Sequence, residues 1–376
     1  MPQKPKAGLS SKAKAASKPQ PSPSPAEAQP SAVHLSEIKA QQRLLDIYAA
    51  AFSEVLARDN FTEILQEIKQ ALFNRDFTAA FGREDYLEAY AARWSPTRAL
   101  GYAAIFKSLE RRFRGLVSKE DDQPYDTSAE AGDEGGSAQT SDAPASRLRM
   151  LCIGGCAAEQ VAFASFLQSY SLRGTLTLLD SGPWSSISSN LQTHLTTPPT
   201  LSPYASASAK ASNHALIFPT QLTLQVEQHD VLSMPKDELS RLIGTSDQPS
   251  VVTILFTLNE LYTEGGIGKS TKFLASLGEV LANESLLLVV DSPGSYSEAA
   301  VGKEKKKYPM HWLLDHTLLE KSPAGLQWAK LESQDSLWFR LPESLKYPIQ
   351  LENMRYQLHL YKLTKGTAPE HDVMTA

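Results

Sequence analysis

Small and acidic residues follow three apolar segments of this chain. Gly154 and Gly155 come directly after RLRMLCI, Asp180 ends TLTLLD, and Asp230 follows LTLQVEQH. A glycine turn before a helix lets the backbone approach a ligand closely, and an acid ending the next strand accepts hydrogen bonds from a ribose. Together these residues predict an adenosyl-nucleotide site in which Asp230 would accept the adenine amino group. Each acid by itself is more often a loop residue or a helix cap.

A second glycine-rich stretch, GGIGKST at residues 265–271, is a weaker candidate for chemistry. A phosphate-binding loop needs a glycine five positions before Gly268, where this chain has Thr263. The acids Glu260 and Glu264 also lie close by in the sequence, which is a poor setting for phosphates. We expect a glycine-containing loop that leads into a helix, and a nucleotide hydrolase remains an alternative.

The two cysteines, Cys152 and Cys156, flank the first glycine turn and have no adjacent histidine. Two cysteines exclude a disulfide-stapled secreted scaffold and a four-thiolate zinc site. We expect small buried side chains, no metal, and a reduced intracellular compartment. No apolar run approaches the roughly 20 residues that a membrane-spanning helix needs, so no membrane partner is expected.

The segments that carry these residues alternate between strand and helix patterns. Asp and Gly occur at the carboxyl ends of the apolar runs, which is typical of a parallel, doubly wound α/β sheet whose ligands bind at that edge. The closing segments SLWFRLP and MRYQLHLYKL alternate apolar and polar residues and predict an antiparallel edge. Residues 183–214 are rich in Ser, Thr, Pro and Ala, and we expect an insertion there.

Composition divides the chain into five parts. Residues 1–34 hold five Lys and one Glu and predict a disordered basic tail. Residues 35–117 have apolar residues at helical spacing and predict an all-helical subdomain. Residues 118–146 predict an acidic disordered linker, 147–365 the α/β domain, and 366–376 a C-terminal tail.

Charge is distributed unevenly over these parts. The totals of 37 Lys plus Arg and 42 Asp plus Glu give a net charge of −5, which excludes a strongly basic nucleic-acid binder as a description of the whole chain. The last helix of the helical segment should start at Ser95 as cap with Pro96 in its first turn. Two basic clusters are candidate contacts for RNA phosphates, although most charge runs are only solvated. They are Lys107, Arg111, Arg112 and Arg114 near the end of that helix, and Lys303, Lys305, Lys306 and Lys307.

Several stretches together resemble the class I S-adenosylmethionine-dependent methyltransferases, and most of all the fungal family of large-subunit ribosomal RNA uridine-N3 methyltransferases. The general methyltransferase pattern is matched loosely, whereas RWSPTRAL and FTLNELYT are unusual and support the specific family. The stretches are AARWSPTRALGYAAIF (91–106), LCIGGCAAEQVAF (151–163), LTLLDSGPW (177–184), ILFTLNELYT with GKSTKFL (254–274), LLLVVDSPGSYSE (286–298) and YPIQLENMRYQLHLYKL (347–363).

The resemblance implies a Rossmann-like seven-stranded sheet with its last strand antiparallel, and S-adenosyl-L-methionine as cofactor. It places Gly154 and Gly155 under the methionine part of the cofactor, Asp180 at the ribose and Asp230 near the adenine. It places Thr257, Asn259 and Glu260 at the end of the fourth strand, facing the methyl acceptor. The chain departs from the usual pattern at three positions, where an acid and two later glycines are replaced. These positions are Cys152, Cys156 and Ala158.

The activity implied is methylation of a uridine N3 in large-subunit rRNA, free or in a pre-ribosomal particle. We expect Glu260 to act as the general base and Asn259 to orient the acceptor, while cofactor binding or helix capping are equal alternatives for Glu260. N3 is hidden in paired RNA, so the target should be looped or flipped out. A stacking partner for it is sought among Tyr262, Tyr296 and Trp312, each of which is equally suited to the core.

Other properties follow from this hypothesis, and other functions compete with it. A monomer in the nucleus or nucleolus is expected, with the cytoplasm as the alternative. One competing function is a catalytically inactive RNA-binding or ribosome-assembly protein of the same fold. Another is a methyltransferase that acts on a protein or a small molecule.

Overall fold

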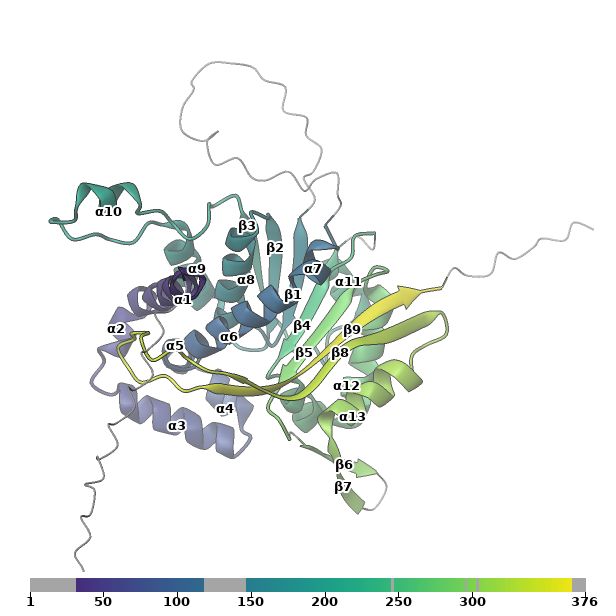
Figure 1. Cartoon of the computed structure of the whole chain (residues 1–376). Helices are drawn as coiled ribbons and strands as arrows, with labels where there is room; N and C mark the ends of the chain where they lie inside the picture. The colour runs from purple at the N-terminus through teal and green to yellow at the C-terminus, as the bar shows by residue number, and fades with distance from the viewer. Residues whose placement is uncertain (1–31, 118–146, 245–246, 295, 302–303, 367–376) are drawn as a thin grey trace, which may run out of the picture.

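A seven-stranded sheet forms the centre of the protein (Figure 1). The computed structural model describes residues 32–117, 147–244, 247–294, 296–301 and 304–366. The segments expected to be disordered, 1–34 and 118–146, and the expected C-terminal tail, 366–376, therefore lie almost wholly outside the described residues.

The order of the strands is β3-β2-β1-β4-β5-β9-β8. Strands β1 to β5 are parallel, and β9 runs antiparallel to both β5 and β8. The expected doubly wound α/β sheet with an antiparallel edge is thus confirmed, and the chain order reverses between β1 and β4. The strands are β1 (Leu148–Ile153), β2 (Gly174–Asp180), β3 (Leu222–Gln228), β4 (Val251–Leu255), β5 (Leu286–Asp291), β8 (Leu326–Phe339) and β9 (Met354–Lys365).

Helices cover both faces of this sheet, as a parallel sheet requires. One face is covered by the N-terminal helices together with α8 and α9, and the other by α11, α12 and α13. The N-terminal helices are α1 (Ala32–Ala51), α2 (Ser53–Leu56), α3 (Phe61–Phe73), α4 (Phe77–Phe81), α5 (Glu84–Arg93), α6 (Ser95–Ser108) and α7 (Glu110–Arg114). The later ones are α8 (Ala157–Ser169), α9 (Ser185–Thr196), α10 (Ala207–Ala211), α11 (Lys236–Ile243), α12 (Leu258–Val280), α13 (Met310–Asp315) and η2 (His316–Glu320).

Alternation along the strands divides the buried residues into two cores. In β1, Met150 and Cys152 point to the face covered by α6 and α8, whereas Leu151 and Ile153 point to the face covered by α12. Successive side chains of a strand face opposite sides of a sheet, so one short apolar run contributes to both cores. The polar ends of the strands are consequently left at the sheet edges.

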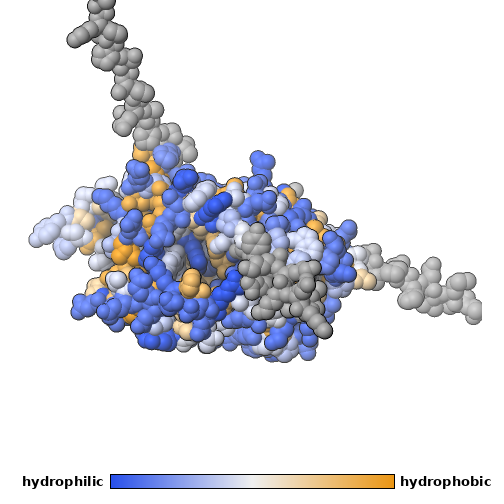
Figure 2. All heavy atoms as spheres, turned by 90° about the horizontal axis from the view of Figure 1, so that it is seen from below, coloured by the Kyte–Doolittle hydropathy of each residue, from blue (hydrophilic) through white to orange (hydrophobic). Residues whose placement is uncertain are grey.

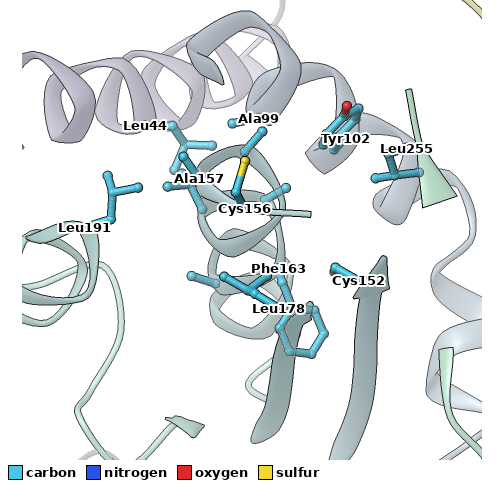
Figure 3. Packing of buried hydrophobic residues seen from close by; sticks show 14 of the residues in the cluster. Leu44, Ala99, Tyr102, Cys152, Cys156, Ala157, Phe163, Leu178, Leu191 and Leu255 are labelled. Atoms are coloured by element: carbon cyan, nitrogen blue, oxygen red, sulfur yellow. The ribbon is translucent and has the colours of Figure 1, made fainter. Parts of the chain in front are cut away.

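The helical segment 35–117 has no core of its own. Buried side chains of α1, α6, α8 and the sheet belong to one continuous cluster, part of which Figure 3 shows around Leu44, Ala157 and Phe163. The hydroxyl of Tyr48 in α1 donates to the carbonyl of Ala157 at 2.7 Å. The helices are therefore an integral layer over the sheet rather than a separate subdomain.

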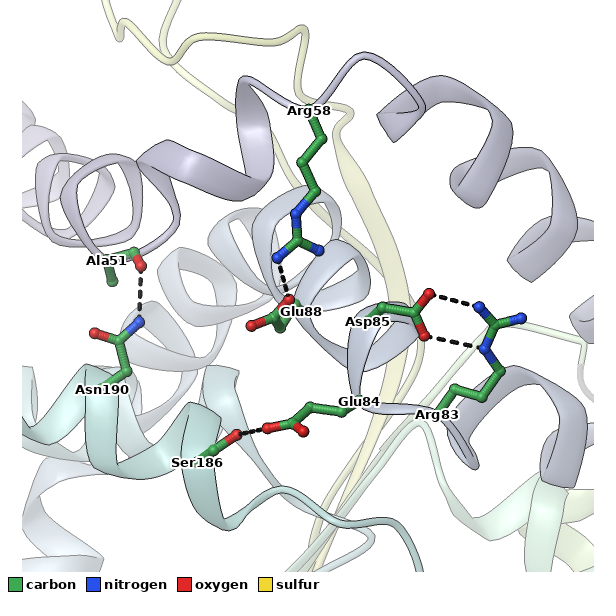
Figure 4. Close-up of polar contacts among 8 residues, drawn as sticks. All are labelled: Ala51, Arg58, Arg83, Glu84, Asp85, Glu88, Ser186 and Asn190. Atoms are coloured by element: carbon green, nitrogen blue, oxygen red, sulfur yellow. Dashed lines mark hydrogen bonds and ion pairs between the residues drawn. The ribbon is translucent and has the colours of Figure 1, made fainter.

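Polar contacts fix α5 and α9 in the same layer (Figure 4). The amide of Asn190 in α9 donates to the carbonyl of Ala51 at 2.7 Å, and the hydroxyl of Ser186 donates to Glu84. Arg58 forms an ion pair with Glu88 at 2.6 Å. These contacts fasten α9 to α1 and α5, and α5 to the segment that follows α2.

The structure differs from the sequence-based expectations in three places. Residues 185–196, expected in an insertion, form α9, because Ile187, Leu191 and Leu195 recur every four residues and are buried. The fourth strand ends at Leu255, and the residues from Leu258 onward begin α12. Lysines 305–307, expected in a loop, belong to β7 (Glu304–Pro309), which pairs with β6 (Tyr296–Val301).

The start of α6 is partly as expected. Pro96 lies in the first turn, but Ser95 is the first helical residue and does not cap the helix. Its hydroxyl oxygen is buried and has no hydrogen-bond partner. The side chain is held against the carboxyl edge of the sheet instead.

Candidate functional site

A cavity of about 340 Å³ opens at the carboxyl ends of β1, β2, β3 and β4, under helices α4 to α6. Figure 2 looks onto this side of the molecule and shows a hollow with hydrophilic and hydrophobic residues at its rim. Small-molecule sites usually measure roughly 300–1,000 Å³, so the cavity has room for one nucleotide-sized ligand. It adjoins the point where the strand order reverses, as sequence-based reasoning expects for this fold.

The glycine turn after β1 forms the floor of the cavity. Gly154 lines it with a φ of +64°, and its N–H donates to the carbonyl of Leu179 at 2.8 Å. A methyl group at Gly154 would collide with the side chain of Thr257. Gly155 does not line the cavity, because its α-carbon faces Cys152 inside the turn. The structure thus brings only the first of the two predicted glycines to the ligand.

Gly154→Ala should destabilise the protein more than Gly266→Ala does. Gly266 has a similar φ of +68° but open space around it, so its variant carries only the backbone strain of about 1–2 kcal/mol. At Gly154 the collision with Thr257 adds roughly 1–3 kcal/mol. Urea unfolding of both variants measures the difference, and equal losses would contradict the close approach to Thr257.

Asp180 and Asp230 both line the same cavity as Gly154. One carboxylate oxygen of Asp180 accepts the N–H of Gly182 at 2.7 Å. Burial raises the pKa of Asp180 to about 6, against the opposing effect of the hydrogen bond from Gly182. Asp230 is exposed at the rim, where its carboxylate accepts the N–H of Leu232 at 2.9 Å. Asp180 is therefore the internal acid of the pair and Asp230 the peripheral one.

The junction of β4 and α12 contributes Thr257 and Glu260 to the cavity, but not Asn259. The hydroxyl of Thr257 lies within hydrogen-bond distance of the carbonyls of Leu255 at 3.2 Å and Gly154 at 3.3 Å, so it ties β4 to the glycine turn. The backbone N–H of Asn259 donates to Asp291 at 3.3 Å, and its amide oxygen is buried without a partner. Glu260 is the member of the predicted catalytic pair that faces a ligand.

Acidic groups dominate the electrostatics of the cavity. Burial, together with the nearby charge of Asp180, raises the pKa of Glu260 to about 8. Burial likewise raises the pKa of Glu159 to about 7, although this carboxylate accepts the N–H of Cys156 at 3.0 Å. The only opposing cation that lines the cavity in the described chain is Arg98. Such a group of acids favours a ligand that carries positive charge.

The high pKa of Glu260 predicts how stability changes with pH. Its ordinary value is 4.5, so between 4.5 and about 8 the folded protein binds more protons than the unfolded chain. Stability of the ligand-free protein therefore falls as pH rises through this interval, and Glu260→Gln removes this contribution. The melting temperature of the variant should exceed that of the wild type by an amount that grows from pH 5 to pH 8. A constant offset would contradict the raised pKa.

Three residues of α6 form a wall that sequence reasoning did not identify. Ser95, Arg98 and Tyr102 are spaced by three and four residues, lie on one helix face and all line the cavity. The guanidinium of Arg98 donates to the hydroxyl of Tyr90 and lies 4.9 Å from the ring centroid of Phe256. The unusual stretch RWSPTRAL holds Ser95 and Arg98. Their helical spacing is the feature of the sequence that could have predicted a shared helix face.

Phe256 is a further residue that the sequence did not reveal. It lines the cavity with a φ of +59°, which is rare for a bulky side chain. Its ring stacks on Tyr102, with 6.4 Å between centroids. A strained backbone that aims an aromatic ring into a cavity is typical of a functional site.

The predicted basic cluster at the end of the helical segment does not line this cavity. Arg111 and Arg112 line a separate hollow with Leu286, the first residue of β5, so they lie at the opposite edge of the sheet (Figure 1). Lys107 pairs with Glu37 at 3.1 Å, and Arg114 with Glu110 at 2.9 Å. Lysines 305–307 belong to β7, and Lys303 lies outside the described residues.

Other sequence candidates are placed away from the cavity chemistry. Residues 265–271 lie in the middle of α12, at a kink where Gly266 has non-helical dihedrals, so they do not follow a strand as a phosphate-binding loop must. Tyr262 is buried in the second core and is not available for stacking. The side chain of Tyr296 lies outside the described residues, and Trp312 is 46% exposed.

The part of the chain that the structure describes contains no group of three or more His, Cys, Asp or Glu side chains placed to hold a metal ion. Cys152 and Cys156 are buried free thiols, as expected, and burial raises the pKa of both. None of the described helices is long and apolar enough to cross a membrane.

The strand order and the cavity at its reversal point are those of a nucleotide-binding methyltransferase. Residues 48–362 match the family described as "Putative SAM-dependent methyltransferase", and the chain belongs to this family. This confirms the class expected from the sequence, with S-adenosylmethionine as cofactor.

Individual known proteins are also similar to this chain. The 25S rRNA (uridine(2843)-N(3))-methyltransferase of Saccharomyces cerevisiae is 29% identical over 361 residues, which cover 88% of this chain and 87% of that protein. The CMeT domain of the citrinin polyketide synthase is 14% identical, with a TM-score of 0.38 over 77% of this chain and 60% of that one. A 16S rRNA (adenine(1408)-N(1))-methyltransferase from Catenulisporales acidiphilia is 12% identical, with a TM-score of 0.31 over 59% and 89% of the two chains. The two structural scores are too low to carry an argument.

Proposed function

We propose that this methyltransferase transfers a methyl group to N3 of a uridine in large-subunit rRNA. The yeast relative with this activity supports the choice of acceptor, because the similarity extends over most of both chains. The observation that carries the chemistry is the position of Glu260, a carboxyl group with a raised pKa in the wall of the cofactor cavity. Uridine N3 carries a proton that must be removed, and a carboxylate within the same cavity provides a base for it.

The cavity residues fit S-adenosylmethionine. Gly154 presents bare backbone at the floor of the cavity, and Ser95 in the wall has a buried hydroxyl oxygen without a hydrogen-bond partner. Asp180 has one oxygen on Gly182 and can accept the ribose hydroxyls with its remaining lone pairs, while Asp230 at the rim is assigned to the adenine.

Arg98 is assigned to the carboxylate of the cofactor. Among the described residues it forms no ion pair, and its guanidinium donates instead to the neutral hydroxyl of Tyr90. An arginine fork binds a carboxylate through two parallel hydrogen bonds. The acids Glu159 and Glu260 then balance the positive charges at the other positions of the ligand.

Proton removal from the acceptor is assigned to Glu260. When bound, S-adenosylmethionine supplies a methyl group that its sulfonium already activates, so the protein has to orient the acceptor and remove the proton. Glu260 loses its own proton as a cation enters the cavity, because positive charge lowers the pKa of a nearby acid. The carboxylate then accepts the N3 proton. Asn259 has an indirect role, because its backbone N–H donates to Asp291 and its side chain does not line the cavity. Thr257 and Gly155 maintain the turns that follow β4 and β1.

Mass analysis of rRNA nucleosides tests this proposal. The purified protein and S-adenosylmethionine should produce 3-methyluridine in large-subunit rRNA from a strain that lacks the enzyme, with Glu260→Gln as the negative control. Cofactor binding without formation of 3-methyluridine would support the alternative of a methyltransferase with another acceptor. Absence of cofactor binding would leave the catalytically inactive RNA-binding alternative.

Partner and compartment belong to the same proposal. The substrate rRNA, free or in a pre-ribosomal particle, implies a nucleolar protein, with the cytoplasm as the alternative. We assign Lys107, Arg111, Arg112 and Arg114 to outlying phosphate contacts, since none of these four lines the cavity. Lys303, Lys305, Lys306 and Lys307, whose side chains lie outside the described part of the structure, are assigned the same role. A monomer is sufficient, because residues of one chain surround the cavity.

A further inference from the structure

Two tryptophans are unusually exposed on the side of the molecule that α13 covers. Trp338 near the end of β8 is 51% exposed, and Trp312 in α13 is 46% exposed. Single exposed apolar side chains are common, and only their surroundings can mark an interaction site. The neighbours of each ring show which of the two is available to a ligand.

Trp338 lies between two arginines. The guanidinium carbons of Arg340 and Arg355 are 5.0 Å and 5.7 Å from the ring centroid. Arg355 also donates to the hydroxyl of Ser336 at 2.9 Å, which holds its side chain in place. Within the described chain neither arginine has a carboxylate in ion-pair distance, so both charges remain available to an anion.

Trp312 is the middle ring of a stack of three. Tyr308 and His316, each four residues away, both have centroids 5.3 Å from a ring of Trp312, and the interplanar angles are 17° and 3°. Both faces of the Trp312 side chain are therefore covered by neighbouring rings, and Trp312 offers no free face for stacking.

Both tryptophans belong to the same face of the β8–β9 pair. Trp338 is the register partner of Arg355, and alternation along β9 puts His359 and Tyr361 on that face as well. The ring centroids of His359 and His311 are 5.8 Å apart, and the hydroxyl of Tyr361 donates to Asp315 at 2.6 Å. Helix α13 therefore packs on this face of β9. Figure 1 shows α13 beside these two strands.

This face begins at the edge of the sheet that holds Glu260. In the register of β5 and β9, Asp291 pairs with Gln357, so Arg355 lies two residues beyond the carboxyl end of β5. Asp291 in turn accepts the backbone N–H of Asn259, the neighbour of Glu260. A chain that leaves the cavity at this edge therefore reaches Arg355 and Trp338 first.

We propose that Trp338, Arg340 and Arg355 bind single-stranded RNA next to the methylated nucleotide, an inference that rests on the proposed rRNA substrate. Bases stack on exposed aromatic rings, and arginines contribute both phosphate contacts and stacking. Two unpaired guanidinium groups beside a tryptophan favour a polyanion over a protein partner. These three residues are distinct from the lysines and arginines predicted from the sequence.

Binding of a fluorescein-labelled 15-nucleotide oligouridine, followed by anisotropy, tests the surface. Trp338→Ala should weaken binding by about tenfold, without changing the dependence on salt. Arg340→Gln and Arg355→Gln should weaken binding and also reduce the slope of log affinity against log salt. Tyr204→Ala is the matched control, because this tyrosine is 96% exposed on another part of the molecule. Unchanged affinity for S-adenosylmethionine shows that each variant is folded.

Each outcome decides for or against the surface. A Trp338→Ala variant that binds like Tyr204→Ala, or wild-type protein that binds neither oligouridine nor a 15-base-pair RNA duplex, would overturn it, and the second result would direct attention to a protein partner. Equal affinity for duplex and single strand would reject stacking. The rRNA assay tests the proposed function separately. RNA binding that depends on the tryptophan, without formation of 3-methyluridine, would support the surface and contradict the proposed function. Formation of 3-methyluridine without such binding would support the proposed function and contradict the surface.

Discussion

Glu260→Gln should slow methyl transfer to rRNA by about a hundredfold or more, because a general base typically contributes a factor of roughly 10²–10⁴. The variant keeps the size of the side chain and loses only the ability to accept a proton. Its affinity for S-adenosylmethionine should fall far less, since in the free protein at neutral pH Glu260 is mostly protonated. Single-turnover methyl transfer and calorimetry measure the two effects separately.

The matched control for this prediction is Glu264→Gln. Glu264 lies one turn further along α12, also lines the cavity and also has its pKa raised by burial. A decrease confined to Glu260→Gln would locate the base, whereas equal decreases in both variants would indicate a general electrostatic effect. The wild-type rate should rise with pH until Glu260 is deprotonated, and this rise should be absent from the residual activity of Glu260→Gln.

Asp180→Asn should weaken the binding of S-adenosylmethionine by about 10- to 100-fold, the usual range for one buried hydrogen bond to a charged acceptor. Asparagine still offers an oxygen to the N–H of Gly182, so the turn after β2 keeps its hydrogen bond. What is lost is the second acceptor assigned to the ribose. Isothermal calorimetry with S-adenosylmethionine measures the affinity, and an unchanged value would remove Asp180 from the cofactor site.

Two further variants place this result in context. Asp230→Asn should have a smaller effect, because Asp230 is exposed at the rim and water competes for its hydrogen bonds. Arg98→Gln should weaken S-adenosylmethionine but not its decarboxylated analogue, if the guanidinium binds the carboxylate. Equal losses for both ligands would assign Arg98 to the protein structure instead.

Much of the sheet was predictable from local patterns. The apolar runs around Met150, Leu176 and Val252 are short, end in polar or small residues and alternate with helical segments, which identifies a parallel α/β sheet. Residues at the carboxyl ends of such strands necessarily share an edge. Gly154, Asp180 and Asp230 could therefore be expected to lie together, and they do line one cavity.

The helical layer was predictable as helices but not as part of the site. Ser95 and Arg98 lie more than fifty residues from Gly154 in the sequence, and only the packing of α6 on α8 brings them to the cavity. The same limit applies to α9, whose polar composition concealed the buried stripe of Ile187 and Leu191. Long-range packing decides such placements, and a local pattern carries no information about it.

The sequence by itself determined the α/β class, the identity of the strand-end acids and the resemblance to a methyltransferase family, because these depend on residue type and spacing along the chain. The tertiary structure decided which of the candidates face a ligand. It turned Glu260 into the cavity and Asn259 away from it, moved Arg111 to the opposite edge, and placed Trp338 beside Arg355. Charge and burial at a site depend on neighbours from distant segments, and those neighbours exist only once the helices have packed on the sheet.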